Sequence, residues 1–102
     1  MSIEYTPQAE WDILEAVDSI LDDLGAGVAR AFRHRLEQTL TGLEAMPHTG
    51  SPVDPPSPNF PGLRFRPVHR FRGRVVYYYP TPTGIYVVRV LHAHQDTAGT
   101  FG

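Results

Sequence analysis

The sequence contains no cysteine and no lysine. The absence of cysteine excludes a disulfide framework, a thiolate zinc site and a cysteine nucleophile, and it fits a protein of a reducing compartment. The absence of lysine excludes a side-chain amine that forms a Schiff base or acts as a general base. All nine basic residues are therefore arginines.

Long hydrophobic runs are also missing. The longest apolar stretches, residues 75–79 and 85–88, are much shorter than the roughly 20 residues of a membrane-spanning helix. The N-terminus has no basic segment followed by an apolar run, so it does not resemble a signal peptide. We expect a soluble, cytoplasmic protein. Its 102 residues fit one domain, 1–102, and the content of 41% hydrophobic and 20% charged residues is typical of a globular chain.

Charge is distributed unevenly along the chain. Residues 1–29 include seven acidic residues and no basic one, whereas residues 30–102 include nine arginines and four acidic residues. Residues 60–92 contain six arginines and no acidic residue at all. A segment with this excess of positive charge is suited to attract an acidic partner or a nucleic-acid backbone.

Two amphipathic helices are predicted in the first half, after a possible short strand at residues 2–5. Thr6 and Pro7 are typical of a helix N-terminus, because threonine caps free backbone N–H groups and proline suits the first turn. Apolar residues then recur every three or four positions until residues 25–27, Gly-Ala-Gly, end the helix. A second periodic run reaches Met46 and stops at Pro47. So short a connection predicts an antiparallel helical hairpin.

The second half has the pattern of a β-sheet. Residues 47–62 hold six prolines and predict an extended surface loop. Residues 63–72, 75–79 and 85–91 are rich in aromatic and β-branched residues, and residues 81–84 form a turn between the last two strands. The sequence predicts an α+β fold of order β-α-α-β-β-β, with the helical hairpin packed on one face of a mainly antiparallel sheet.

The arginines of the predicted strands form the first candidate site. Side chains two positions apart share a face of a strand, which predicts one cationic surface of Arg64, Arg66, Arg70, Arg72 and Arg74, provided that Gly73 introduces no bulge. The alternative is a solvated outer face whose phenylalanines point inward. The arginines could also pair with the acidic residues of the first helix.

Other site chemistry has weaker support. His92 and His94, followed by Asp96, could be imagined as a ligand cluster. Two histidines on a strand need a further ligand from elsewhere, however, and the sequence offers no recognised metal-binding spacing, so we expect no metal and no cofactor. The four serines lie outside any nucleophile-elbow motif, so a hydrolase triad is not supported. The three tyrosines at 77–79 predict strand packing more than a platform for stacking bases.

A set of segments in fixed order carries a family resemblance. After the helical hairpin come Leu-x-x-Met-Pro-x-x-Gly at residues 43–50, Gly-Leu-Arg at 62–64, and a hydrophobic strand that ends in tyrosine. The last segment is Arg-Val-Leu-His-x-x-x-Asp at 89–96. Together these segments resemble the ParE branch of the RelE/ParE toxin superfamily over almost the whole chain.

The resemblance implies a bacterial type II toxin that is neutralised by a ParD-like antitoxin. ParE-type toxins poison DNA gyrase by binding, so this interpretation implies no catalytic residue. RelE-type toxins instead cut mRNA on the ribosome. Arg74 lies where a RelE-type arginine would be, and His92 or His94 could move a proton, but Phe101 has no hydroxyl where the ribonuclease pattern has a tyrosine. The gyrase interpretation is favoured, with the ribonuclease and a non-toxic binding module of the same fold as alternatives.

The candidate residues for binding the target or the antitoxin lie in the strands and in the segment that follows them. They are Arg64, Arg66, Arg70, Arg72, Arg74, Arg89, His92, His94 and Asp96. For His92 and Asp96 the alternative is a hydrogen bond that fixes the tail on the sheet. The tail itself, residues 97–102, is small and polar apart from Phe101, so we expect it to add little to the core.

Overall fold

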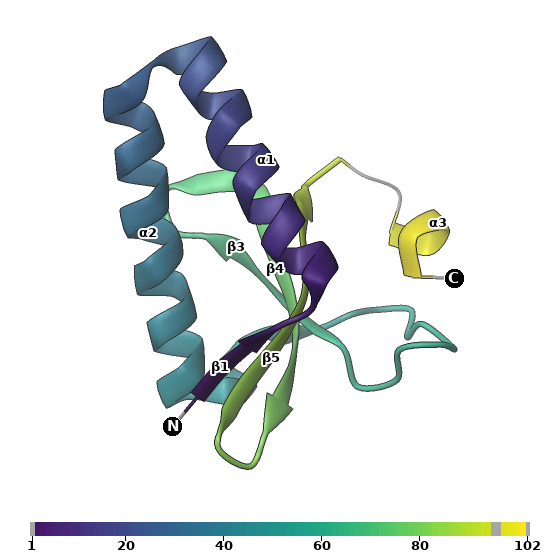
Figure 1. The fold of residues 1–102 in the computed structure, drawn as a ribbon. Helices are drawn as coiled ribbons and strands as arrows, with labels where there is room; N and C mark the ends of the chain where they lie inside the picture. The colour runs from purple at the N-terminus through teal and green to yellow at the C-terminus, as the bar shows by residue number, and fades with distance from the viewer. Residues whose placement is uncertain (1, 95–96, 102) are drawn as a thin grey trace.

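The computed structural model describes residues 2–94 and 97–101 of the chain. Its central feature is a five-stranded sheet in the order β1-β5-β4-β3-β2. Two long helices, α1 and α2, form an antiparallel hairpin in front of this sheet (Figure 1). The elements are β1 (Ser2–Tyr5), α1 (Pro7–Leu24), α2 (Ala26–Ala45), the 3₁₀ helix η1 (Pro47–Thr49), β2 (Ser51–Pro52), β3 (Arg64–Val68), β4 (Phe71–Thr81), β5 (Gly84–His92) and α3 (Thr97–Phe101).

The predicted start of α1 is confirmed. The Thr6 hydroxyl accepts a hydrogen bond from the Ala9 N–H at 2.9 Å and donates one to the Val88 carbonyl at 2.7 Å. One side chain therefore caps the helix and also ties its first turn to β5. The helix ends at Gly25, which has a φ of 93°, a conformation that favours glycine, and α2 begins at the next residue.

The strand pairing confirms the predicted α+β class. β3, β4 and β5 form an antiparallel meander, in which Tyr79 lies opposite Tyr86 near the β4–β5 turn. β1 is the exception, because it pairs in parallel with the outer edge of β5. The central strands β4 and β5 are covered on both faces, as their nearly continuous apolar sequences predict.

The helix-facing side of the sheet holds the larger hydrophobic cluster. Phe32 of α2 and Tyr78 of β4 are completely buried there, together with Val76, Ile85 and Val87 of the central strands. Phe32 meets Phe71 edge-to-face, with ring centroids 5.3 Å apart. This packing fixes the distance between the helical hairpin and the strands, and so it determines the shape of the surfaces at their margins.

The opposite side of the sheet is covered by the proline-rich segment and α3. Phe60 and Phe101 pack edge-to-face, and Phe101 also contacts the Tyr77 ring, with both centroid distances close to 5 Å. The Ser57 hydroxyl donates a hydrogen bond to the Phe101 carbonyl at 3.0 Å. The expectation that the tail adds little to the core is therefore wrong, because Phe101 is 3% exposed and completes this second cluster. Phe101 is the one large side chain of this tail, and its burial provides the contact with the sheet that the small residues before it could not make.

The segment at 47–62 is also less extended than its prolines predict. It contains η1 and the two-residue strand β2, and its Val53 and Phe60 pack against the second cluster. Within the described ranges 2–94 and 97–101, no helix is both long and apolar enough to cross a membrane.

Candidate functional site

The turn between α2 and β2 is held by the buried hydroxyl of Tyr78. This hydroxyl donates to the Pro47 carbonyl at 2.6 Å and accepts from the Gly50 N–H at 3.0 Å. Burial raises the pKa of the Tyr78 phenol, so the group remains a donor at neutral pH. A Cβ at Gly50 would collide with the same hydroxyl, which explains why a glycine ends the Met-Pro-x-x-Gly segment.

Two of the candidate arginines hold the same turn. Nη1 of Arg64 donates to the Gly50 carbonyl at 2.6 Å and to the His48 carbonyl at 3.2 Å. Nη2 of Arg66 donates to the Thr49 carbonyl at 2.9 Å. Three successive backbone carbonyls of this turn are thus bonded to arginines from β3, so part of the positive charge serves the fold.

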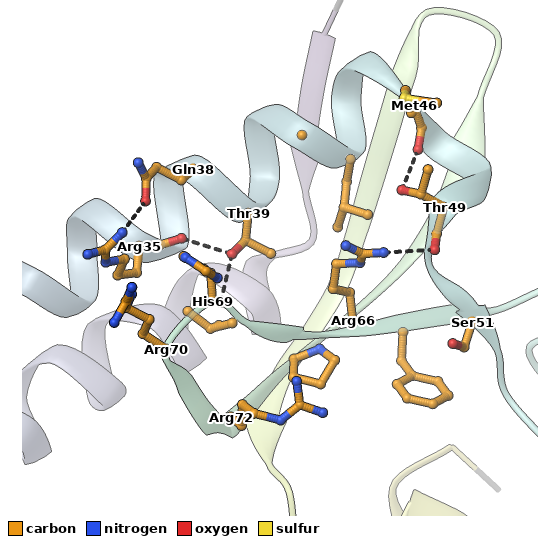
Figure 2. Close-up of a pocket in the computed structure, with 15 residues that line it drawn as sticks. Arg35, Gln38, Thr39, Met46, Thr49, Ser51, Arg66, His69, Arg70 and Arg72 are labelled. Atoms are coloured by element: carbon orange, nitrogen blue, oxygen red, sulfur yellow. Dashed lines mark hydrogen bonds between the residues drawn. The ribbon is translucent and has the colours of Figure 1, made fainter.

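A groove lies between α2 and the outer edge of β3, and Figure 2 shows the side chains that line it. β2 pairs only with Arg64 and Phe65, which leaves the rest of this edge of β3 beside the groove. The groove has a volume of about 960 Å³. Its lining includes four arginines and one histidine but no acidic residue: Arg35, Arg66, Arg70, Arg72 and His69. We call this feature the arginine groove.

Hydrogen bonds fix the walls of the arginine groove. The half-buried Arg35 donates to the Gln38 side chain at 3.1 Å. The Thr39 hydroxyl donates to the Arg35 carbonyl at 2.8 Å and accepts from the His69 N–H at 3.0 Å, which ties α2 to the β3–β4 turn. At that turn, Arg70 has a φ of 64° and lies exposed beside Arg72 at the end of the groove (Figure 2).

The predicted single surface of five arginines does not form. The pairing of β3 with β4 is interrupted between Pro67 and Val68, and Arg70 lies in the turn instead of a strand. The physical reason lies in β4 itself: Val68 pairs with Phe71 and Pro67 with Val75, so residues 72–74, around Gly73, interrupt the two-residue alternation. Arg66, Arg70 and Arg72 line the arginine groove, whereas Arg74 lies at a separate small cavity near α1.

The cavity near Arg74 contains the one ion pair found among the described residues. Asp12 of α1 accepts from Nε and Nη2 of Arg89 at 2.7 and 3.0 Å, and from the Val90 N–H at 3.0 Å. The hydrogen bond to Asp12 raises the pKa of Arg89, and burial lowers that of Arg74. Arg89 therefore meets the acidic first helix, a pairing that the sequence left open for the five arginines between 64 and 74 and did not predict for Arg89.

The remaining candidates lie beyond this ion pair. His92 ends β5 and lines the small cavity, while His94 is exposed in the turn that follows. Asp96 lies outside the described residues. In the described part of the chain, no group of three or more histidine or acidic side chains is arranged to hold a metal ion.

Sequence reasoning missed Arg35, which lies in α2 and not in the arginine-rich half. Its contribution depends on how α2 packs beside β3, a relation that strand periodicity does not contain. The one available signal is its spacing four residues before Thr39, which places both side chains on one face of the helix.

The arrangement of a helical hairpin over this sheet is shared with a known structure. The solved structure described as "Chromosomal ParDE TA system from P. aeruginosa" superposes with a TM-score of 0.70 at 17% sequence identity, over 90% of this chain and 95% of that one. At this level of identity the likeness defines the fold. No curated protein sequence matches the chain.

The sequence itself matches the family described as "ParE toxin of type II toxin-antitoxin system, parDE" over residues 3–97. The fold and this match define the chain as a toxin of the type II class. It belongs to the ParE toxin family.

Proposed function

We propose that this toxin inhibits DNA gyrase by binding and without catalysis, and that a ParD-like antitoxin neutralises it by occupying the arginine groove. In this proposal the arginine groove is the contact surface for acidic segments of both proteins. Its occupation by the antitoxin prevents the toxin from meeting gyrase.

The charge of the arginine groove is the observation that carries this proposal. Arg70 and Arg72 are exposed, and the lining contains no carboxylate that would neutralise them. Arginine side chains bind carboxylates through two parallel hydrogen bonds, which gives an acidic peptide both affinity and register. A concentrated positive potential also accelerates the encounter with an acidic partner.

The surroundings of Arg74 support binding over ribonuclease activity. An arginine that holds a scissile phosphate needs an approach that is free of negative charge. Arg74 instead shares its small cavity, about 90 Å³ in volume, with Asp12 and Glu15. The Asp12 charge is paired with Arg89, whereas the Glu15 carboxylate, which has no ion pair among the described residues, repels a phosphate group.

A supercoiling assay with purified gyrase and relaxed plasmid tests the proposed target. The wild-type toxin should inhibit supercoiling, and the double variant Arg70→Gln, Arg72→Gln should require at least tenfold more protein for the same inhibition. Arg33→Gln is the matched control, because Arg33 is exposed on α2 and does not line the arginine groove. Equal inhibition by the wild type, the double variant and Arg33→Gln would show that the arginine groove does not contact gyrase.

Expression in cells separates the proposed target from the alternatives. We expect growth arrest with a DNA-damage response. Cleavage of mRNA at the ribosome without that response would favour the ribonuclease, and normal growth would favour a non-toxic binding module.

A further inference from the structure

The outer face of α1 carries a row of large apolar side chains that the fold leaves uncovered. Trp11, Leu14, Leu21 and Leu24 are 68%, 55%, 45% and 64% exposed. They account for four of the six large hydrophobic residues that are exposed in the described part of the chain. Spacings of three and seven residues place Trp11, Leu14 and Leu21 along one side of the helix, and Leu24 extends the exposed apolar surface at its C-terminal end. We call this row the α1 stripe.

The α1 stripe is separate from the face that holds the helix on the sheet. That face consists of Ala9, Ala16 and Ile20, which are buried, with Ile13 and Val17 packed against the main cluster. The helix thus has one apolar side for the core and a second one that the core does not use. A row of large exposed apolar side chains on one helix is typical of a protein–protein contact.

The charges beside the α1 stripe indicate what it binds. The helix carries six acidic residues and no basic one, and only Asp12 is paired in an ion pair among the described residues. Glu10, Glu15, Asp18 and Asp22 are exposed alongside the stripe or within it. The neighbouring α2 adds two acidic residues and three arginines, so the hairpin, residues 7–45, carries eight acidic and three basic residues and a net charge of −5.

A second copy of this chain could not neutralise the acidic residues beside the α1 stripe. Two α1 helices packed along their stripes would bring carboxylates against carboxylates, which opposes association. A helix with the same apolar spacing but arginine or lysine beside it would bury the four side chains and pair with the acidic margin.

We propose that the α1 stripe is a docking site for an amphipathic helix with basic flanks. This site is independent of the arginine groove, which has the opposite charge and lies between α2 and β3. The proposal does not depend on gyrase or the antitoxin being the partners of the groove.

The single tryptophan of the chain lies in the stripe, which gives a direct measurement. The probe is a synthetic peptide of 18 residues, without tryptophan, with leucines at heptad spacing and arginines on both flanks. Its matched counterpart has glutamate in place of each arginine. Binding of the basic peptide should shift the emission of Trp11 to shorter wavelength and reduce its quenching by iodide, since the ring leaves water.

Two variants test the contacts, with circular dichroism to confirm the fold. Leu14→Gln with Leu21→Gln should weaken binding at least tenfold, because both changes remove exposed apolar surface without touching the core. Asp18→Arg with Asp22→Arg should reverse the preference between the two peptides. The double variant Arg70→Gln, Arg72→Gln should bind as the wild type does.

Three outcomes would overturn the proposal. The first is an unchanged Trp11 emission with the basic peptide at millimolar concentration. The second is binding of the acidic peptide as tight as that of the basic peptide, which would show that the acidic residues beside the stripe do not select the partner. The third is self-association of the toxin that buries Trp11, which would make a second copy the occupant.

Discussion

Arginines from one stretch of sequence lie in two different environments in this toxin. Arg64 and Arg89 are held by the protein itself, through backbone carbonyls of the turn before β2 and through Asp12. Arg70 and Arg72 are exposed in a groove without carboxylates. The difference shows that a count of positive charges does not locate a binding surface, because the neighbours of each guanidinium decide whether its charge is available.

The same division, between groups that the protein holds and groups that it leaves exposed, applies to the rest of the molecule. The anchored region comprises the Tyr78 hydroxyl, the Asp12–Arg89 pair and the aromatic cluster around Phe101, and changes there should lower the free energy of unfolding. The open region comprises the exposed Arg70 and Arg72 of the arginine groove and the α1 stripe, and changes at these side chains should leave stability intact. Substitutions in the anchored region should therefore have large effects on stability, and those in the open region small ones.

Phe101→Ala should lower the free energy of unfolding by about 4 kcal/mol, because it removes a buried ring from the second cluster and leaves a cavity. Denaturant unfolding measures the loss. Phe101→Leu, which keeps most of the apolar volume, should lose much less. A stability close to that of the wild type for Phe101→Ala would assign the tail to the open region.

Asp12→Ala should lower the free energy of unfolding by about 3 kcal/mol, because it leaves the Arg89 guanidinium and the Val90 N–H without their acceptor. Thermal unfolding at neutral pH measures the shift, and Asp23→Ala is the control on an exposed part of the same helix. If the two variants melted at the same temperature, the ion pair would not anchor α1 to β5.

Tyr78→Phe should lower the free energy of unfolding by about 2 kcal/mol, because the Pro47 carbonyl and the Gly50 N–H both lose the hydroxyl that joins them. The matched control is Tyr86→Phe, whose ring is partly exposed on β5. Hydrogen exchange at Gly50 should also accelerate in Tyr78→Phe. Unchanged protection of Gly50 would contradict the role of this hydroxyl in holding the turn.

Arg70→Gln with Arg72→Gln should change the free energy of unfolding by less than about 0.5 kcal/mol, because neither exposed side chain is held by an ion pair within the described residues. Denaturant unfolding measures this difference alongside Arg33→Gln. A loss as large as that of Asp12→Ala would show that the groove arginines are anchors too.

The sequence predicts the backbone architecture more fully than the site. The Thr6-Pro7 start, the Gly25 boundary and the strand alternation are local signals, and the structure confirms the elements that they predict. The arginine groove combines Arg35 of one helix with Arg66 of a strand and Arg70 of an irregular turn. That combination depends on tertiary packing, which the two-residue period of a strand does not contain, so the sequence predicted one surface of five arginines where the structure separates Arg74 from the groove. Phe101 was missed for a related reason, since its burial depends on a cluster that forms only after the chain returns to the far side of the sheet.

The association rate of the toxin with a ParD-like antitoxin that neutralises it tests the central claim most directly. Stopped-flow measurements at several salt concentrations compare the wild type, the double variant Arg70→Gln, Arg72→Gln, and Arg33→Gln. If the open arginines attract the antitoxin, the double variant should associate at least tenfold more slowly at low salt and depend less on salt, while Arg33→Gln remains close to the wild type. Identical rates and identical salt dependence for the double variant and the wild type would contradict the account.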